Sequence, residues 1–486
     1  MAAPMEEIFK DLYSRIVSLH TDRQHEDYFK LVDATLTDMI RSLSQHDKGF
    51  RIDGQLLEVI NCVLSSTSHL TDQSHSAEVT SCQTNCFRLC RNLVARETEN
   101  QTILRETTLI ENVCRCVNNV LTKNSCTEDV LVLLRCAVQF LGNYCSGNST
   151  NQMHVWQQCS SLFKHMLAMD DMKLREYTMM VVHLILSGNQ FGKARVDTAA
   201  SELIIGCLSV ATQTESENGL LVVEDILMLV DCFQQIFSKI PDAEKLLTLE
   251  ICINSLKRLP EDETVTEACD MGVKYSVPDV SNVQYIAADF VSQCHHIPNL
   301  ASTNGENESK MLCIVKELEC LGLASSHHRH YNILQENDQL LRTSIHLLQN
   351  LEEIGHQGQN VFSNIDKVTR QAEVNTDHPV FGLKRDLIRL IGNLVYQNTA
   401  NQDLVRELDG IPLILNKTTI DANNPFISQW SIFAAHNLTE GNEKNISYIA
   451  ALKMEGIANN QALLDELGIS AEVQGDKVFV KKQRTE

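Results

Sequence analysis

Glycine, proline and aromatic residues are scarce in this sequence of 486 residues, with 20 Gly, 8 Pro and only 5% aromatic side chains. A β-sandwich or β-barrel of this length needs many tight turns, which are rich in Gly and Pro. Hydrophobic residues still make up 43% of the chain, which is enough for a large core and excludes a wholly disordered protein. The composition therefore predicts a folded, mainly helical protein.

Basic residues are also few, because 41 Lys and Arg stand against 63 Asp and Glu and give a net charge of −22. Such a surface repels phosphate backbones and anionic lipids, so we expect no nucleic acid as partner. Long apolar runs are missing as well: the run 179–186 is too short to span a bilayer, and the N-terminal residues lack a secretory signal. We expect a cytoplasmic protein without membrane insertion, whose cysteines stay reduced.

Sequence signatures of catalysis are missing too. The chain has no phosphate-binding loop, no Gly-rich dinucleotide turn, no His-Glu-x-x-His and no nucleophile elbow. We therefore predict that it is not an enzyme and holds no cofactor. Cys82, Cys86 and Cys90 recur every four residues, which places them on one helix face and predicts core packing.

A group of Cys and His residues in the middle of the chain has donor types that suit zinc. Their spacing matches no zinc-binding pattern, so we predict no metal, and a zinc-dependent activity remains the enzyme alternative. The group consists of Cys294, His295, His296, Cys313, Cys320, His327, His328 and His330.

What the sequence does contain is a repeat, in which an Asn is followed eight residues later by a second Asn. The four pairs are Asn92 and Asn100, Asn143 and Asn151, Asn393 and Asn401, and Asn437 and Asn445. Gln follows the second Asn in three of them. From Asn92 to Asn143 is 51 residues and from Asn393 to Asn437 is 44, and such periods are typical of armadillo and HEAT repeats. We predict an all-α, armadillo-like α-solenoid, a superhelix of stacked helical repeats.

The repeat predicts three helices per unit. In 385–395, RDLIRLIGNLV, the apolar residues form one stripe that must be buried. Asn401 is predicted to cap the next helix, Gly410 to end it and Pro412 to open another. A third helix is predicted after Asn424, with that residue as its cap.

Three parts follow from the distribution of the repeats: an N-terminal helical array at 1–211, a divergent middle at 212–382 and a C-terminal array at 383–486. Within the middle, the polar segment between Gly355 and Gly382 has no clear periodicity, which is typical of a functional or mobile segment. Near the C-terminus, ISAEVQGDKVFVKK alternates apolar and polar residues around Gly475 and Asp476 and predicts a short hairpin that caps the array.

The block 384–480, above all RDLIRLIGNLVYQNTANQDLVRELDGIPLIL and NPFISQWSIFAAHNLTEGN, resembles the C-terminal region of the ataxin-10 family of armadillo-repeat proteins. The segments CFRLCRNLVARETENQTIL and CAVQFLGNYCSGNSTNQMHV resemble the family's N-terminal region. The resemblance spans nearly the whole chain and is faint from residue 212 to 382.

This resemblance implies a scaffold that acts in cytokinesis, in neurite outgrowth and neuronal survival, and in kinase signalling. The implied partners are an O-linked N-acetylglucosamine transferase, a heterotrimeric G-protein β subunit and mitotic kinases, together with self-association into a homo-oligomer. The implied locations are cytoplasmic and perinuclear, with the centrosome, the midbody and the ciliary basal body. A regulator of a G-protein subunit, either an exchange factor or a chaperone, is the alternative function.

A solenoid exposes one wall lined by a helix of each repeat, and Asn side chains there can bond the backbone of an extended ligand. The first Asn of each pair and the residue four positions before it define a hypothetical partner-binding groove. Its residues are Arg88, Asn92, Gln139, Asn143, Arg389, Asn393, Phe433 and Asn437. Arg88 and Arg389 favour acidic or mixed partner segments. Ala at Asn393 and Arg389 should then weaken partner binding and leave melting unchanged. The alternative is that these Asn residues bridge neighbouring loops or face water.

Overall fold

The computed structural model describes residues 11–12, 14–18, 27–44, 51–52, 54–65, 76–95, 97–122, 127–188, 198–214, 216–260, 277–301, 308–365, 374–452, 469–474 and 477–482. The chain divides into two compact units that meet between Ile240 and Pro241. Unit 1 is 1–240 and unit 2 is 241–486.

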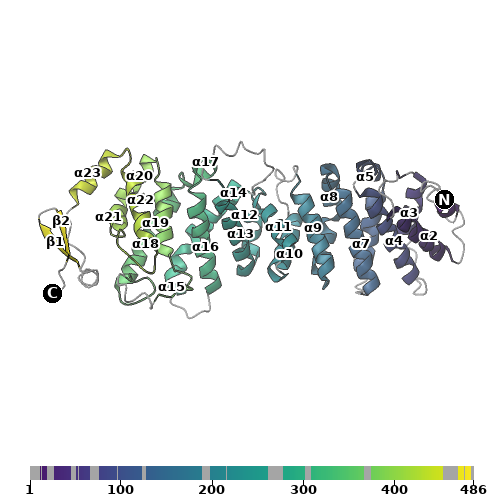
Figure 1. Ribbon diagram of the computed structural model, residues 1–486, viewed down its shortest axis with the longest axis horizontal. Helices are drawn as coiled ribbons and strands as arrows, with labels where there is room; N and C mark the ends of the chain where they lie inside the picture. The colour runs from purple at the N-terminus through teal and green to yellow at the C-terminus, as the bar shows by residue number, and fades with distance from the viewer. Residues whose placement is uncertain are drawn as a thin grey trace. The chain divides into compact units, whose positions relative to one another are not determined.

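Unit 1 is built from helices in two layers (Figure 1). One layer holds α2, α4, α7, α9 and α11 in succession, and the other holds α3, α6, α8 and α10. The bounds are α2 Tyr28–Ser44, α3 Gly54–Ser65, α4 Ser76–Val94, α5 Thr98–Arg105, α6 Leu109–Thr122, α7 Glu128–Cys145, α8 Ser149–Ala168, α9 Met172–Leu186, α10 Thr198–Thr214, α11 Glu217–Leu227, α12 Cys232–Ile236 and η4 Phe237–Lys239.

Unit 2 repeats the two-layer plan. The first layer holds α13, α16, α19 and α22, and the second holds α14, α18, α20 and α23. The bounds are α13 Asp242–Lys257, α14 Val280–Gln293, η7 Cys294–His296, α15 Ile297–Ala301, α16 Glu308–Ala324, α17 His328–Tyr331, η8 Asn332–Leu334, α18 Asp338–His356, α19 Leu383–Leu394, α20 Thr399–Glu407, α21 Gly410–Leu415, α22 Ile427–Thr439 and α23 Glu443–Ala451. The all-α, helical-repeat fold class predicted from the sequence is confirmed.

Helix α19 shows why the apolar stripe was a partial guide to burial. Leu387, Ile391 and Leu394 of the predicted stripe are buried, as expected. Asn393, which lies off the stripe, is buried as well, with 3% of its surface exposed. Because α19 packs between α16 and α22 and also against α18, it is covered on more than one side.

The predicted helix boundaries in this region need three corrections. Asn398, not Asn401, caps α20, and its side chain accepts a hydrogen bond from the backbone N–H of Asn401. Gly410 begins α21 instead of ending α20, because the left-handed residue between them is Asp409 with φ 54°. Asn424 caps α19 instead of the helix that follows it in sequence, so its capping partner is distant along the chain.

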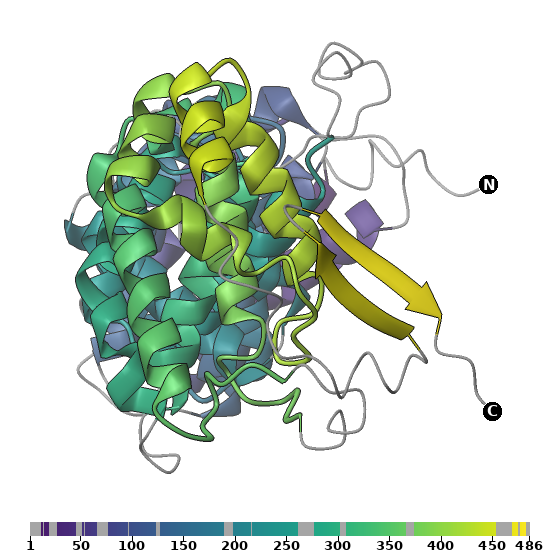
Figure 2. The ribbon, with the colours of Figure 1, turned by 90° about the vertical axis from the view of Figure 1, so that its left-hand side faces the viewer.

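The hairpin predicted near the C-terminus is confirmed. Strands β1, Ile469–Gln474, and β2, Lys477–Lys482, pair antiparallel, with Ile469 opposite Lys482 (Figure 2). The predicted turn residues 475–476 lie outside the described residues, as does part of the polar segment, 366–373.

Two other predictions concern the three cysteines on one helix face and the lack of a membrane-spanning helix. Cys82, Cys86 and Cys90 are buried in the core of unit 1, and burial raises the pKa of Cys90 to about 12. These thiols therefore pack as small apolar side chains. Across the part of the chain that the structure describes, no helix is both long and apolar enough to cross a membrane.

A buried acidic side chain lies in the packed layers of unit 2. Glu317 on α16 has 2% of its surface exposed, and its Oε2 has no hydrogen-bond partner among the described residues. Burial, followed by the nearby carboxyl of Asp289, raises the pKa of Glu317 well above its usual range. The carboxyl group of Glu317 therefore binds its proton more tightly in the folded protein than in the unfolded chain. As the pH rises from the usual pKa of a glutamate towards the raised pKa, this difference lowers the free energy of unfolding.

Glu317→Gln should therefore raise the melting temperature at pH 8, with a gain that shrinks towards pH 5. Glu319→Gln on the same helix is the matched control. Lys316 and Lys257, each 3.0 Å from Glu319, outweigh its burial and lower its pKa. Removing that carboxylate should lower the melting temperature at pH 8. Melting curves at several pH values test both, and a lower melting temperature for Glu317→Gln at pH 8 would contradict the argument.

Candidate functional site

The first Asn of the repeated pair ties each repeat to the one before it. In three repeats its Nδ2 donates to a backbone carbonyl of the preceding helix in the same layer: Asn143 to Arg91 at 3.0 Å, Asn393 to Gly322 at 3.0 Å and Asn437 to Gly392 at 2.9 Å. In two of the three bonds the acceptor is at an equivalent place, since Arg91 and Gly392 both come directly before the first Asn of their own repeats. The sequence had left open that these Asn residues bridge neighbouring loops; here they bridge neighbouring helices instead.

The second Asn closes the end of its own repeat's helix. In all four copies its Nδ2 donates to the carbonyl seven residues earlier: Asn100 to Leu93 at 2.7 Å, Asn151 to Tyr144 at 3.0 Å, Asn401 to Leu394 at 2.9 Å and Asn445 to Leu438 at 2.8 Å. These carbonyls lie in the last turn of a helix, where no helical N–H is left to reach them. The buried Asn replaces water as their partner.

The Gln after the second Asn reaches forward to the next repeat. Gln101 Nε2 donates to the carbonyls of Asn143 and Ser146 at 2.9 and 3.1 Å. Gln402 Nε2 does the same with Asn437 and Glu440 at 2.8 and 3.3 Å. The Oε1 of each Gln accepts from the Asn that caps the next helix, Asn148 or Asn442. We call the two Asn and the Gln of these repeats the amide ladder.

One Gln in the divergent middle of the sequence makes the same contacts as the Gln residues of the amide ladder. Gln335 Nε2 donates to the carbonyls of Asn393 and Tyr396 at 3.2 and 2.9 Å, the role that Gln101 and Gln402 play in their repeats. The residue before it is Leu334, so the Asn of the motif is missing there. In the last repeat the Gln position is Ile446, which is exposed.

The eight predicted groove residues fall into two groups. In unit 1, Arg91 gathers three of them: its side chain donates to Asn92 Oδ1 at 3.3 Å and Gln139 Oε1 at 2.6 Å, and its carbonyl accepts from Asn143. Arg88 donates to Asn85 of its own helix. Sequence reasoning overlooked Arg91, which the pattern of four-residue offsets does not select.

In unit 2, Arg389 lies over the Trp430 ring with its guanidinium carbon 5.0 Å from the centroid, and Phe433 meets that ring edge-on. Asn393 and Asn437 are buried and bonded within the protein. Removing the Asn393 side chain therefore breaks inter-repeat bonds, so unchanged melting no longer follows for that substitution. A role of these residues in partner binding remains a prediction.

A second surface of unit 2 is formed by a loop that hydrogen bonds hold in place. Loop 416–426 joins α21 to α22 and is tied by hydrogen bonds to neighbours on two sides. Asn424 Oδ1 accepts from the backbone N–H groups of Lys384 and Arg385, in the first turn of α19, at 3.0 and 3.3 Å. Ala422 N–H donates to the carbonyl of Ile365 at 2.9 Å, and Asn423 Nδ2 donates to the carbonyl of Ser363 at the same distance. The loop is thus held by the polar segment that the sequence singled out.

Two large apolar side chains project from this fixed loop. Ile420 is 58% exposed and Phe426 is 69% exposed. Phe426 also has φ 67°, in the left-handed region that an aromatic residue rarely adopts. Both residues line one pocket of about 500 Å³, together with Val374 and Phe381. We call Ile420, Phe426 and the pocket the loop surface.

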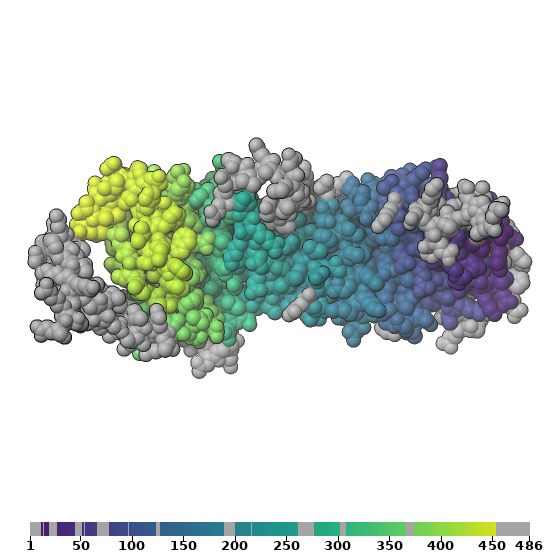
Figure 3. All heavy atoms as spheres, in the orientation of Figure 1, coloured from purple at the N-terminus to yellow at the C-terminus, as the bar shows by residue number. Residues whose placement is uncertain are grey.

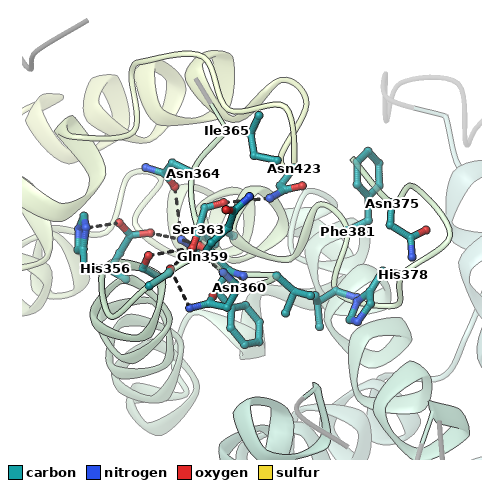
Figure 4. A pocket seen from close by; sticks show the side chains of 17 residues that line it. His356, Gln359, Asn360, Ser363, Asn364, Ile365, Asn375, His378, Phe381 and Asn423 are labelled. Atoms are coloured by element: carbon teal, nitrogen blue, oxygen red, sulfur yellow. Dashed lines mark hydrogen bonds and ion pairs between the residues drawn. The ribbon is translucent and has the colours of Figure 1, made fainter. Parts of the chain in front are cut away.

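A polar cavity of about 530 Å³ also borders the loop, since Asn423 of the loop lines it (Figure 4). Its wall includes Asn360, Ser363 and Asn423 on one side and Asn375 and His378 on the other. Most of these polar groups are bonded to the chain itself. Asn360 Nδ2 donates to the carbonyl of Ile354 at 2.7 Å, and His378 Nδ1 accepts from the backbone N–H of Val380. The cavity therefore supports the loop more than it offers open ligand groups.

A buried ionic cluster underlies the cavity. Lys384 and Lys417 both contact the carboxylate of Glu352, and Lys384 Nζ lies 2.5 Å from Glu352 Oε1. Lys384 also donates to the carbonyl of Phe362 at 2.6 Å. Burial lowers the pKa of Lys384, although Glu352 opposes this shift. The cluster joins α18, the polar segment, α19 and the loop.

Comparison with known proteins places the chain in a family. The sequence profile described as "Spinocerebellar ataxia type 10 protein domain" matches residues 383–481. The chain is 30% identical to Ataxin-10 of Xenopus tropicalis over 89% of its own length and 87% of the relative's, and 32% identical to Ataxin-10 of Homo sapiens over 82% of each. This chain belongs to the ataxin-10 family. A shorter match, 51% identical over 18% of the chain and 15% of the relative, is to the Ataxin-10 homolog of Dictyostelium discoideum.

The family region contains most of the contacts described for unit 2. Loop 416–426, Arg389 and the Asn residues of the last two repeats all lie within the ataxin-10 domain match at 383–481. Side chains of α22 and α23, in yellow, form part of the surface of unit 2 (Figure 3). The partners of loop 416–426 at Ser363 and Ile365 lie before the match. They belong to the polar segment, which was the sequence signal for this site.

The zinc alternative has no assembled ligand set in the described residues. Nowhere in that part of the chain do three or more His, Cys, Asp or Glu side chains gather as a metal site. Cys320 Sγ instead lies 3.4 Å from Cys252 Sγ in the core of unit 2.

Gln402→Met should lower the free energy of unfolding by about 2 kcal/mol, because it removes the bonds to Asn437 and Glu440 and leaves buried carbonyls unpaired. Met is similar in length, so packing is largely kept. Gln429→Met, at an exposed position of α22, is the control and should change stability by less than about 0.5 kcal/mol. Denaturant unfolding followed by circular dichroism measures both, and equal stabilities would contradict the role of the amide ladder.

Proposed function

We propose that this ataxin-10 family member is a non-catalytic scaffold that binds other proteins, and that the loop surface is one of its docking sites. The observation that carries the proposal is that a hydrogen-bonded loop holds Ile420 and Phe426 in the solvent. Exposed apolar groups on a rigid frame bind with little loss of conformational entropy.

The backbone at Phe426 supports the same proposal. A left-handed conformation at a non-glycine residue costs about 1 kcal/mol or more, and such strain persists where the surroundings impose it. Here the surroundings are the bonds of Asn424 to α19 and of Asn423 to the polar segment. The matching occupant is an apolar segment of another protein, with an aromatic or branched side chain to enter the pocket beside Phe426.

The more specific cellular roles that we propose rest on the family resemblance alone. They are a part in cytokinesis, neurite outgrowth and kinase signalling, at the centrosome, the midbody or the ciliary basal body. The proposed partners are an O-linked N-acetylglucosamine transferase, a heterotrimeric G-protein β subunit and mitotic kinases. Each can be tested for dependence on the loop surface.

Phe426→Asn should separate binding from stability. Asn tolerates a left-handed backbone, so the free energy of unfolding of the variant should equal that of the unaltered chain or exceed it by up to about 1 kcal/mol. Partner affinity should fall about tenfold or more if Phe426 is an interface anchor. Proximity labelling with the intact chain identifies partners, and titration of each purified partner against both proteins measures the affinities.

Leu221→Ser is the matched control, because Leu221 is a comparably apolar, exposed residue of unit 1. It should leave the partner set unchanged. If partners bind Phe426→Asn, Ile420→Ser and the unaltered chain with equal affinity, the loop surface is not a docking site.

A further inference from the structure

Two cysteines of neighbouring repeats meet in unit 1. Cys114 lies on α6 and Cys159 on α8, and their sulfur atoms are 2.9 Å apart. The helices that carry them pack against each other in the same layer. A disulfide has a sulfur-to-sulfur distance of about 2.05 Å, so the two thiols need to approach by less than about 1 Å to be joined.

The two thiols differ in access. Cys114 is half-buried, whereas Cys159 is fully buried. A dissolved oxidant can therefore reach Cys114 first, and Cys159 can react only with a group already attached to Cys114. This division into an accessible thiol and a resolving thiol is typical of reversible redox pairs.

We propose that Cys114 and Cys159 form a reversible disulfide under mild oxidation, which covalently joins two adjacent repeats of unit 1. With glutathione disulfide as the oxidant, the Cys114 thiolate attacks one of its sulfurs, forms a mixed disulfide and releases one glutathione. The Cys159 thiolate then attacks the Cys114 sulfur and releases the second glutathione. Two protein thiols are oxidised, one glutathione disulfide is reduced, and the two thiol protons end on the two glutathione molecules.

The surroundings of Cys159 favour its protonated thiol over the thiolate, so the second, resolving step is slower than it would be for an exposed cysteine. The hydrogen bond with Cys114, followed by burial, raises the pKa of Cys159 well above its usual range, and Glu111 adds to this effect. Another thiol that influences Cys159, that of Cys145, is directed instead to the carbonyl of Asn151 at 3.9 Å. The geometry therefore selects one pairing.

Unit 2 offers a control pair within the same chain. Cys252 and Cys320 have sulfur atoms 3.4 Å apart, but both residues are fully buried. If access through a half-exposed thiol sets the rate, this pair should react much more slowly than Cys114 and Cys159 even though the two distances are similar.

The test treats the full chain with glutathione disulfide under native conditions and maps peptides by mass spectrometry without reduction. We expect a linked Cys114–Cys159 peptide that forms at least about tenfold faster than a Cys252–Cys320 link and disappears on adding dithiothreitol. Cys159→Ser should leave Cys114 as a glutathione adduct, whereas Cys114→Ser should leave Cys159 unmodified. Circular dichroism of both variants checks that they are folded.

Three results would overturn the proposal. One is a stable glutathione adduct on Cys114 of the unaltered chain, and another is a Cys145–Cys159 link in its place. The third is a Cys114–Cys159 link that forms only after unfolding in denaturant. None of these results bears on the loop surface, since that surface lies in unit 2.

Discussion

The structure depends on how it satisfies the carbonyl groups at the ends of its stacked helices. A helix leaves its last carbonyls without intrahelical partners, and in a packed array many of these groups are shielded from water. The amide ladder supplies the missing donors. The second Asn serves the helix of its own repeat, as Asn401 does for Leu394, while Gln402 serves the helix of the next repeat.

This constraint explains why the motif is made of amides. A side-chain amide both donates and accepts, so one Gln can bond two carbonyls with its nitrogen and an Asn cap with its oxygen. Charged side chains in the same places would be costly to bury without partners. The same bonds also fix the spacing of neighbouring helices, because Asn437 must reach the carbonyl of Gly392 directly across the contact of α19 and α22.

The amide bonds give the rest of unit 2 a rigid frame. Loop 416–426 starts and ends on helices of that frame and is hydrogen-bonded to α19 and to the polar segment. Its apolar side chains are therefore displayed in a fixed position. The ionic cluster of Glu352, Lys384 and Lys417 adds a second set of buried contacts beneath it.

The period of the Asn pairs was enough to predict the helical-repeat class. The role of the Asn residues could not be decided in the same way. A recurring buried amide and a recurring ligand-binding amide leave the same sequence pattern, and only coordinates show that Asn393 and Asn437 bond within the protein. Helix caps failed for a related reason, because Asn424 caps a helix that is forty residues away in sequence and adjacent in space.

The loop surface could not be predicted from the sequence for a further reason. Ile420 and Phe426 are apolar residues in a helical protein, and such residues are usually buried. Their exposure follows from bonds between segments distant in sequence, such as Asn423 to Ser363, which no local pattern contains. The unusual length of the polar segment was the one local sign that this part of the chain was different.

Isoleucine at position 446 has an implication for how such arrays grow. Gln101 and Gln402 each donate to carbonyls of the next repeat and not of the one before, so these contacts give the array a direction. A helix stacked beyond α23 would receive no amide from Ile446, and its terminal carbonyls would meet a hydrocarbon instead. Position 446 is thus where the forward-reaching amide contacts of the described repeats stop.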